Sequence, residues 1–267
     1  MSFPSFASTT SSSQSRLVYD VWGTDPQFLL VHGLSSNAQT WWQVASVLVD
    51  RGYGAVTVDQ RSHGRSEVAD GGYGWSTMAD DLELVLQAAG ADRVLAAGQS
   101  WGASVVLDFA LRSPERCVGV VGVDGGHAAL RSRFPDWETC AAMLRPAEIP
   151  PVSRDVMREY VAQAHPHWPA AGVDHTVNNF REENGVLVRA LPIPHHMQIV
   201  RELWNHDPVA IVEDLTVPSA IISAGADPAG VDVDTEVISL PGDHDLHVEQ
   251  PEAVAELLIE RFERWRG

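Results

Sequence analysis

Short apolar runs alternate with longer amphipathic stretches along most of this chain, and this alternation is the feature that most limits its fold. The pattern begins at Leu17 and continues toward the end of the sequence, with one interruption. Short apolar runs indicate buried strands, and apolar residues repeated every three or four positions indicate helices. Strands and helices in alternation build a parallel sheet with helices on both faces. We therefore predict an α/β fold with a mostly parallel, doubly wound sheet.

The segments that we interpret as strands are short apolar runs bounded by turn residues. They lie at residues 17–22, 28–31, 55–58, 93–97, 117–123, 219–223 and 236–240. The expected helices lie at residues 41–50, 77–89, 101–112, 209–214 and 251–265. The last helix carries Pro251 in its first turn, where a missing N–H is tolerated.

The alternation stops between His127 and Asp207. This segment is rich in Pro, Trp and His and shows no clear strand pattern. We interpret residues 127–207 as an inserted, mainly helical cap. The core is then formed by residues 1–126 and 208–267.

The charge balance excludes several classes of partner and of chemistry. The 267 residues include 18 Lys or Arg against 36 Asp or Glu, which gives a formal charge of −18. Such a chain repels phosphate backbones and anionic lipid surfaces, so we expect no nucleic-acid and no membrane partner. The sequence contains no lysine, which excludes chemistry that needs a lysine amine, such as pyridoxal phosphate catalysis.

Targeting signals and cysteine use favour a reduced, cytoplasmic protein. Residues 1–15 lack the basic start and apolar centre of a secretory signal peptide. No apolar run approaches the roughly 20 residues that a membrane helix needs. Cys117 and Cys140 are too few for a disulfide framework. The sequence is compatible with a homodimer.

A glycine-rich turn carries the strongest chemical signal. Gly98-Gln99-Ser100-Trp101-Gly102 has the pattern G-x-S-x-G between an expected strand and an expected helix. Glycines permit a cramped turn that lifts the serine oxygen above the edge of the sheet. Ser100 is therefore the candidate nucleophile.

A serine hydroxyl becomes nucleophilic when a base takes its proton. The best candidate is His244, because it follows the last expected strand and so lies at the carboxyl edge of the sheet, where Ser100 also emerges. His247, three residues later, is the alternative.

The base in turn needs a carboxylate at its far ring nitrogen, and two aspartates qualify. Asp124 follows the strand at 117–123, and Asp227 follows the strand at 219–223. Both positions lie at the same edge of the sheet, so position alone does not choose between them. We favour Asp124, because the loop after Asp227 is close to the minimum length for a parallel crossover.

An oxyanion formed on a substrate needs N–H donors. The expected donors are the backbone N–H of Trp101, directly after the nucleophile, and one from the loop after the strand at 28–31. Gly33 in that loop lets Leu34 turn its N–H inward. We expect His32 to have a structural role.

These motifs occur in the order seen in the α/β-hydrolase superfamily. They are His32-Gly33, Asp59-Gln60-Arg61-Ser62-His63-Gly64-Arg65-Ser66, the turn at 98–102 and Gly242-Asp243-His244. The chain resembles a capped bacterial serine hydrolase of the esterase or lactonase type over nearly its whole length. The resemblance implies Ser100 as nucleophile, His244 as base, and Leu34 and Trp101 as oxyanion donors.

The resemblance does not choose between Asp124 and Asp227 as the acid. Asp227 stands at the commonest acid position of the superfamily, although its glycine is displaced and the following helix looks deleted. Haloalkane dehalogenases and zearalenone lactonases include members with an acid at the position of Asp124.

The resemblance implies acyl chemistry, because haloalkane dehalogenases and epoxide hydrolases have aspartate where this chain has Ser100. We expect hydrolysis of an ester or lactone of a small, fairly apolar molecule, without cofactor or metal. The alternatives are a carbon–carbon bond or thioester hydrolase, a ligand-binding receptor or pseudoenzyme, and cofactor-independent oxygen chemistry. The charge of −18 disfavours anionic substrates unless arginines line the entrance, for which Arg131, Arg133 and Arg189 in the cap are the candidates.

The two candidate acids can be separated by substitution. Changing the aspartate that holds the imidazole to Asn should lower kcat by several orders of magnitude, because the wrong tautomer of the imidazole is then favoured. Hydrolysis rates of Asp124→Asn and Asp227→Asn, measured side by side, test this. A larger loss in Asp227→Asn would contradict our preference for Asp124.

Overall fold

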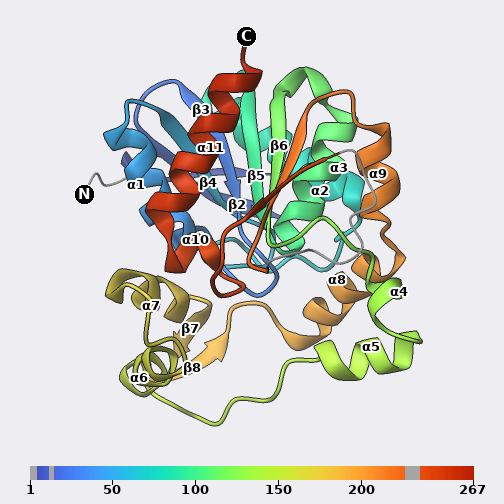
Figure 1. Cartoon of the computed structure of the whole chain (residues 1–267). Coiled ribbons are helices and arrows are strands. Elements are labelled where there is room, and N and C mark those ends of the chain that lie inside the picture. The colour runs from blue at the N-terminus through green and yellow to red at the C-terminus, as the bar shows by residue number, and fades with distance from the viewer. Residues whose placement is uncertain (1–4, 12–14, 226–234) are drawn as a thin grey trace.

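The computed structural model describes residues 5–11, 15–225 and 235–267, and its centre is a twisted eight-stranded sheet (Figure 1). In spatial order the strands are β1 (Ser5–Ser11), β2 (Arg16–Trp22), β4 (Gly54–Asp59), β3 (Pro26–Val31), β5 (Val94–Gln99), β6 (Cys117–Val123), β9 (Ser219–Ser223) and β10 (Glu236–Ser239). β2 pairs antiparallel with both β1 and β4, and the other neighbours run parallel. The predicted α/β fold is therefore confirmed.

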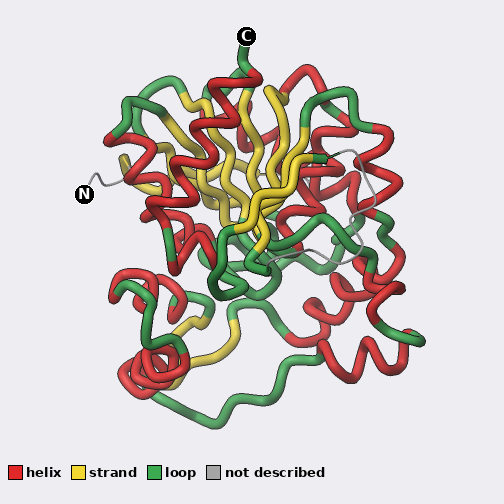
Figure 2. The backbone as a smooth tube through the Cα atoms, viewed as in Figure 1, coloured by secondary structure: helices red, strands yellow, loops and turns green. Residues whose placement is uncertain are grey.

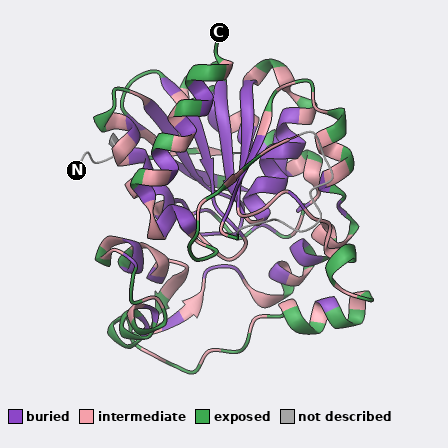
Figure 3. Cartoon of the chain, in the orientation of Figure 1, coloured by how far each residue is buried: buried purple, intermediate pink, exposed green. Residues whose placement is uncertain are grey.

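Helices cover both faces of this sheet. One face packs against α1 (Trp42–Asp50) and α11 (Pro251–Trp265), and the other against α2 (Trp75–Ala89), α3 (Trp101–Arg112) and α9 (Pro208–Asp214). Strands β4, β5 and β6 are buried along their whole length as a result (Figure 3). Strands buried on both faces have nearly continuous apolar sequences, which is why the pattern identified them. Shorter helices are η1 (Ala38–Trp41), η2 (Pro114–Arg116) and α10 (Leu246–Glu249).

The segment between β6 and α9 forms a second layer beyond the carboxyl ends of the strands (Figures 1 and 2). It contains α4 (Leu130–Arg133), α5 (Trp137–Leu144), α6 (Arg154–Ala164), α7 (Ala170–Val177), β7 (Phe180–Glu183), β8 (Val186–Arg189) and α8 (Ile193–Asn205). We call residues 127–207 the insertion. Its action as a cap stays a prediction. Among the helices that the structure describes, none is both long and apolar enough to cross a membrane.

Three strands contradict the sequence analysis. The insertion was expected to contain no clear strand, but β7 and β8 form a hairpin through Asn184 and Gly185, whose φ angles are 52° and 80°. Positive φ at both turn residues is what a type I′ hairpin turn requires, and Asn-Gly was the available signal. Four-residue strands that are largely exposed show too little alternation to reveal themselves. β1 was also missed, because its sequence is mostly Ser and Thr and it pairs only with β2.

Buried charges hold the loop that follows β4. Arg65 Nη1 and Nη2 lie 3.0 and 2.7 Å from the two carboxylate oxygens of Asp20, and Arg65 Nε lies 2.6 Å from Asp59 Oδ2. Both carboxylate side chains are 1% exposed, whereas that of Arg65 is 30% exposed. Asp59 also accepts a hydrogen bond from the N–H of Ala38. One arginine thus joins β2, the loop after β4 and η1.

Removal of Arg65 is expected to destabilise the fold strongly. Arg65→Gln leaves two buried carboxylates without their counter-ion, and we expect a loss of roughly 2 to 3 kcal/mol in the free energy of unfolding. This loss is smaller than the loss expected when a fully buried ion pair is broken, because Arg65 is partly exposed. Arg51→Gln is the control, because the Arg51–Glu256 pair is about half exposed on both sides and contributes less than about 1 kcal/mol. Equal denaturant midpoints for the two variants would contradict this account.

Candidate active site

Ser100 occupies a strained turn between β5 and α3, with φ 53° and ψ −116°. Positive φ is uncommon for a residue with a side chain, and such strain concentrates at functional sites. A Cβ atom at Gly98 would lie 2.1 Å from the carbonyl oxygen of Gly102, and one at Gly102 would lie 2.5 Å from that of His32. Both glycines of the motif are therefore required by close backbone contact.

Asp124 and His244 meet at the carboxyl edge of the sheet. Asp124 Oδ2 lies 2.6 Å from His244 Nδ1, and Asp124 Oδ1 accepts a hydrogen bond from the backbone N–H of Ala224 at 3.0 Å. Asp124 directly follows β6 and has a positive φ of 44°. Asp227, the alternative acid, lies outside the described residues.

His247, the alternative base, lies elsewhere. Its fully buried ring packs 4.5 Å from the ring of Trp41, and Nε2 lies 3.2 Å from Thr40 Oγ1. Burial lowers the pKa of His247 to about 3, so this imidazole is neutral. Its contacts are those of a core side chain.

Direct contacts join the loops that carry Ser100, Asp124 and His244. The N–H of Ser100 donates to the carbonyl of Val123 at 3.0 Å. The side chain of Gln99 donates from Nε2 to the carbonyl of His244 at 3.1 Å. The main chains of Ser100 and His244 are thus each held by a residue adjacent to another member of the set, Val123 beside Asp124 and Gln99 beside Ser100.

Asp124 and His244 each stabilise the charged form of the other. The hydrogen bond to Asp124 raises the pKa of His244 above its ordinary value, against the effect of burial, and the nearby Asp245 carboxylate adds to the rise. Burial alone would raise the pKa of Asp124, but hydrogen bonds from His244 and from Ala224 N–H outweigh it and lower that pKa. Because Nδ1 of His244 faces a carboxylate, the neutral ring carries its proton there and leaves Nε2 as the acceptor.

Two cavities are lined by both Ser100 and His244. Cavity A, of about 110 Å³, extends toward α4 and α8 of the insertion. Cavity B, of about 140 Å³, extends toward η1 and α7. Cavity A is also lined by Trp101, Ser104, Asp124, Gly125, Gly126, His127, Ala128, Leu130, Arg133, Leu203, His206 and Pro208. Cavity B is also lined by Leu34, Ser35, Ser36, Thr40, Gln99, Thr176, Asn179 and Asp245.

The two expected oxyanion donors stand beside Ser100. Leu34 lines cavity B and Trp101 lines cavity A. The N–H of Ser35 donates to His63 Nε2 at 3.2 Å, and within the described residues the N–H of Leu34 makes no hydrogen bond. Trp101 begins α3, so its N–H has no carbonyl one turn earlier. Their function as donors stays a prediction.

Histidines of the insertion contact the core. His195 Nδ1 lies 2.5 Å from the Tyr73 hydroxyl, and His196 Nδ1 lies 2.8 Å from Ser35 Oγ. His165 stacks on Trp168, and both place a ring nitrogen about 3 Å from Asp243 Oδ2, at 3.0 and 3.1 Å.

Asp243 immediately precedes His244 in the chain. Contacts from the insertion to the Asp243 carboxylate therefore reach the loop that carries the candidate base.

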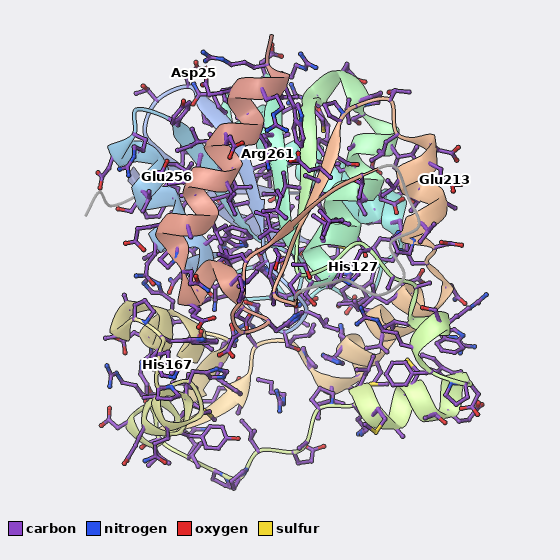
Figure 4. All side chains as sticks on the ribbon, viewed as in Figure 1. Asp25, His127, His167, Glu213, Glu256 and Arg261 are labelled. Carbon is purple, nitrogen blue, oxygen red and sulfur yellow. The ribbon has the colours of Figure 1, made fainter. Side chains whose placement is uncertain are left out.

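Several polar side chains of the cavities were missed or given little weight by sequence reasoning. His127, the first residue of the insertion, lies near the lower ends of the strands (Figure 4), and it follows Asp124 closely enough that the strand end was a usable signal. Asp245 is next to His244, which is a similar signal. Ser104 lies one turn into α3, behind the candidate nucleophile. His206 and Arg133 come from the insertion, where no local pattern marks them.

Comparison with known proteins is consistent with this geometry. A family model described as alpha/beta hydrolase fold matches residues 26–184. Epoxide hydrolase B of Mycobacterium tuberculosis is 35% identical over 100 residues, which cover 37% of this chain and 28% of that protein. The 2-(acetamidomethylene)succinate hydrolase of Mesorhizobium japonicum is 30% identical over 102 residues, which cover 38% of this chain and 36% of the relative. The chain thus spans about a third of the length of these curated relatives.

Solved structures share the fold over nearly the whole chain. A crystal structure of E-2-(acetamidomethylene)succinate hydrolase has a TM-score of 0.80 at 22% identity and covers 97% of this chain and 99% of its own. N-formylmaleamic acid deformylase from Pseudomonas putida S16 has a TM-score of 0.70 at 19% identity, with coverages of 98% and 100%.

The Asp124–His244 contact predicts a measurable titration. We expect the His244 imidazole to titrate above the ordinary histidine value of about 6.5, because the ionised Asp124 stabilises its protonated form. In Asp124→Asn the midpoint should fall, since that carboxylate is lost while burial and the Arg133 charge remain. NMR of ring-labelled histidine, assigned with His244→Gln, gives the midpoint. An unchanged midpoint in Asp124→Asn would show that the two groups do not interact.

Proposed function

The chain belongs to the alpha/beta hydrolase fold family, and we propose that it is a serine hydrolase that cleaves an ester or lactone of a small substrate through an acyl-enzyme on Ser100. The observation that carries this proposal is the 2.6 Å contact between Asp124 and His244 at the wall of a cavity that Ser100 also lines. A strained serine, an imidazole with one nitrogen held by a carboxylate, and backbone N–H groups beside the serine are the parts that acyl transfer needs.

In the proposed reaction, His244 Nε2 takes the proton of the Ser100 hydroxyl as Oγ attacks the substrate carbonyl. The N–H groups of Leu34 and Trp101 stabilise the oxyanion, each by about 3 kcal/mol or more. The tetrahedral intermediate collapses, the bond to the leaving oxygen breaks, and His244 returns its proton to that oxygen. A water molecule, deprotonated by His244, then releases the acid and restores Ser100. Asp124 stays ionised throughout and holds Nδ1–H.

The proposed role of His244 sets the pH dependence. Only the neutral imidazole acts as a base, and the pKa of His244 is raised above its ordinary value. The rate should therefore rise as the pH increases through a midpoint above about 6.5.

Serine at the nucleophile position favours acyl chemistry over the activity that the name epoxide hydrolase B gives to one relative. A carboxylate nucleophile forms an ester with an opened epoxide, which water can then hydrolyse. Serine would instead form an ether, which water does not cleave under these conditions. The curated relative therefore supports the scaffold and not the reaction.

A second candidate is hydrolysis of an amide-type bond. Both a relative and a structural neighbour are named as hydrolases of acetamidomethylene succinate, and a second neighbour is named as a deformylase. The same residues would form an acetyl- or formyl-enzyme, with nitrogen as the leaving atom. Release of acetate from an N-acetyl enamide, at a rate above that from esters, would favour this candidate.

Substitution of Ser100 tests the proposed function. We expect Ser100→Ala to lower kcat for 4-nitrophenyl acetate by at least about 10³-fold, because the nucleophile is removed while the oxyanion donors remain. Ser113→Ala, at the opposite end of α3, is the control and should retain full activity. The wild-type protein quenched early in turnover should carry one acetyl group on Ser100, detected by mass spectrometry. Equal rates for Ser100→Ala and wild type would support a ligand-binding protein instead.

A further inference from the structure

We propose that cavity A binds a carboxylate of the substrate through Arg133, so that the substrates are short acyl compounds that bear a second, ionised carboxyl group. This inference rests on the proposed acyl chemistry at Ser100 and names the substrate class for that site. It replaces the expectation of a fairly apolar substrate.

Arg133 reaches the site from the insertion. It is the last residue of α4 and lines cavity A together with Ser100 and His244. Its Nη2 donates to His127 Nε2 at 3.1 Å, and His127 is itself buried. One nitrogen of the guanidinium is therefore held by a neutral acceptor. A planar guanidinium positioned in this way keeps further N–H donors for a carboxylate.

Arg133 has no carboxylate partner among the described residues. The arginines that make ion pairs there are 51, 61, 65, 112, 116, 158, 261, 264 and 266. The carboxylates near cavity A are already engaged: Asp124 by His244, and Asp108 by His206 at 2.8 Å. Among the residues that the structure describes, no carboxylate therefore neutralises the positive charge of Arg133 at the cavity.

The Arg133 charge is felt at the candidate base. The hydrogen bond from Asp124 raises the pKa of His244 overall, and Arg133 acts against that rise. Burial lowers the pKa of His127, and the Arg133 charge lowers it further. Arg133, Ser100 and His244 line one cavity of about 110 Å³, so a short substrate with one end at Ser100 can place its other end at the guanidinium.

Cavity B has the opposite character. It is lined by Asp245 and by the hydroxyls of Ser35, Ser36, Thr40 and Thr176. A carboxylate in cavity B would face the Asp245 side chain, whereas one in cavity A would face Arg133. Charge therefore orients the substrate, with its anionic arm in cavity A. The volume of about 110 Å³ favours a short arm.

Matched esters test this assignment. Monomethyl glutarate and methyl pentanoate have the same chain length and the same leaving group, and they differ by a terminal carboxylate in place of a methyl group. We expect wild type to prefer monomethyl glutarate. Arg133→Gln should lower kcat/KM for it by about 10- to 100-fold, mainly through KM, and change kcat/KM for methyl pentanoate by less than about twofold. Methanol release is measured at a pH well above the His244 midpoint, so that a shift of that midpoint does not alter the rates.

Two further variants sharpen the result. Arg131, two positions away, donates to Asn205 and lies over the Trp204 ring. Arg131→Gln should therefore leave kcat/KM for both esters unchanged. Arg133→Lys keeps the charge but loses the planar fork, and it should give an intermediate selectivity.

Calorimetry separates this inference from the proposed function. Monomethyl glutarate should bind Ser100→Ala protein at least about 10-fold more tightly than methyl pentanoate, and Arg133→Gln should abolish the difference. Arg133-dependent binding of monomethyl glutarate without hydrolysis of either ester by the wild type would refute the proposed function and leave the carboxylate site standing. Ser100-dependent hydrolysis of both esters at equal rates, unchanged in Arg133→Gln, would refute the carboxylate site and leave the proposed function standing. Equal binding of monomethyl glutarate and methyl pentanoate to Ser100→Ala protein would also refute the carboxylate site.

Discussion

Close backbone contact around the Ser100 turn is the constraint on which the rest of the site depends. The turn fits between the loops after β3 and β6 because Gly98, Gly102 and Gly125 lack a Cβ atom. A Cβ at Gly125 would lie 2.3 Å from the carbonyl oxygen of Ser100. Three chain segments that are distant in sequence therefore touch through their main chains. Side chains placed one or two residues from these contacts have little freedom to move apart, and this is how a loop-built site acquires precise geometry.

The sequence predicted the core of this fold because the physics of that core is local. Buried parallel strands are apolar throughout, and the G-x-S-x-G turn needs glycine for steric reasons that a single chain reveals. The same reasoning placed His244 at the correct edge of the sheet, next to Asp124. It failed for β1 and for the β7–β8 hairpin, since edge and exposed strands are stabilised by pairing and not by an apolar face.

The cavities could not have been read from the sequence. Arg133 and His127 are six residues apart and meet at the start of the insertion, while His206 reaches the same cavity after six intervening elements. No spacing rule connects such positions, because their proximity depends on how the insertion packs against the sheet. Strand position alone did not choose between Asp124 and Asp227 for a related reason: both follow strands that end at one edge, and the preference for Asp124 rested on loop length. Only the contact with His244 distinguishes Asp124 within the described residues.

The contact of Asp243 with His165 and Trp168 has a consequence for how such a molecule diversifies. Asp243, next to His244, is held by His165 at the end of α6 and by Trp168 in the loop before α7, so the insertion that lines part of cavity A also contacts the loop of the candidate base. Replacing the insertion by an unrelated segment would change which molecules fit the cavities and would also remove the contacts to Asp243. A molecule altered in this way would have to gain its new selectivity and keep its turnover in the same step.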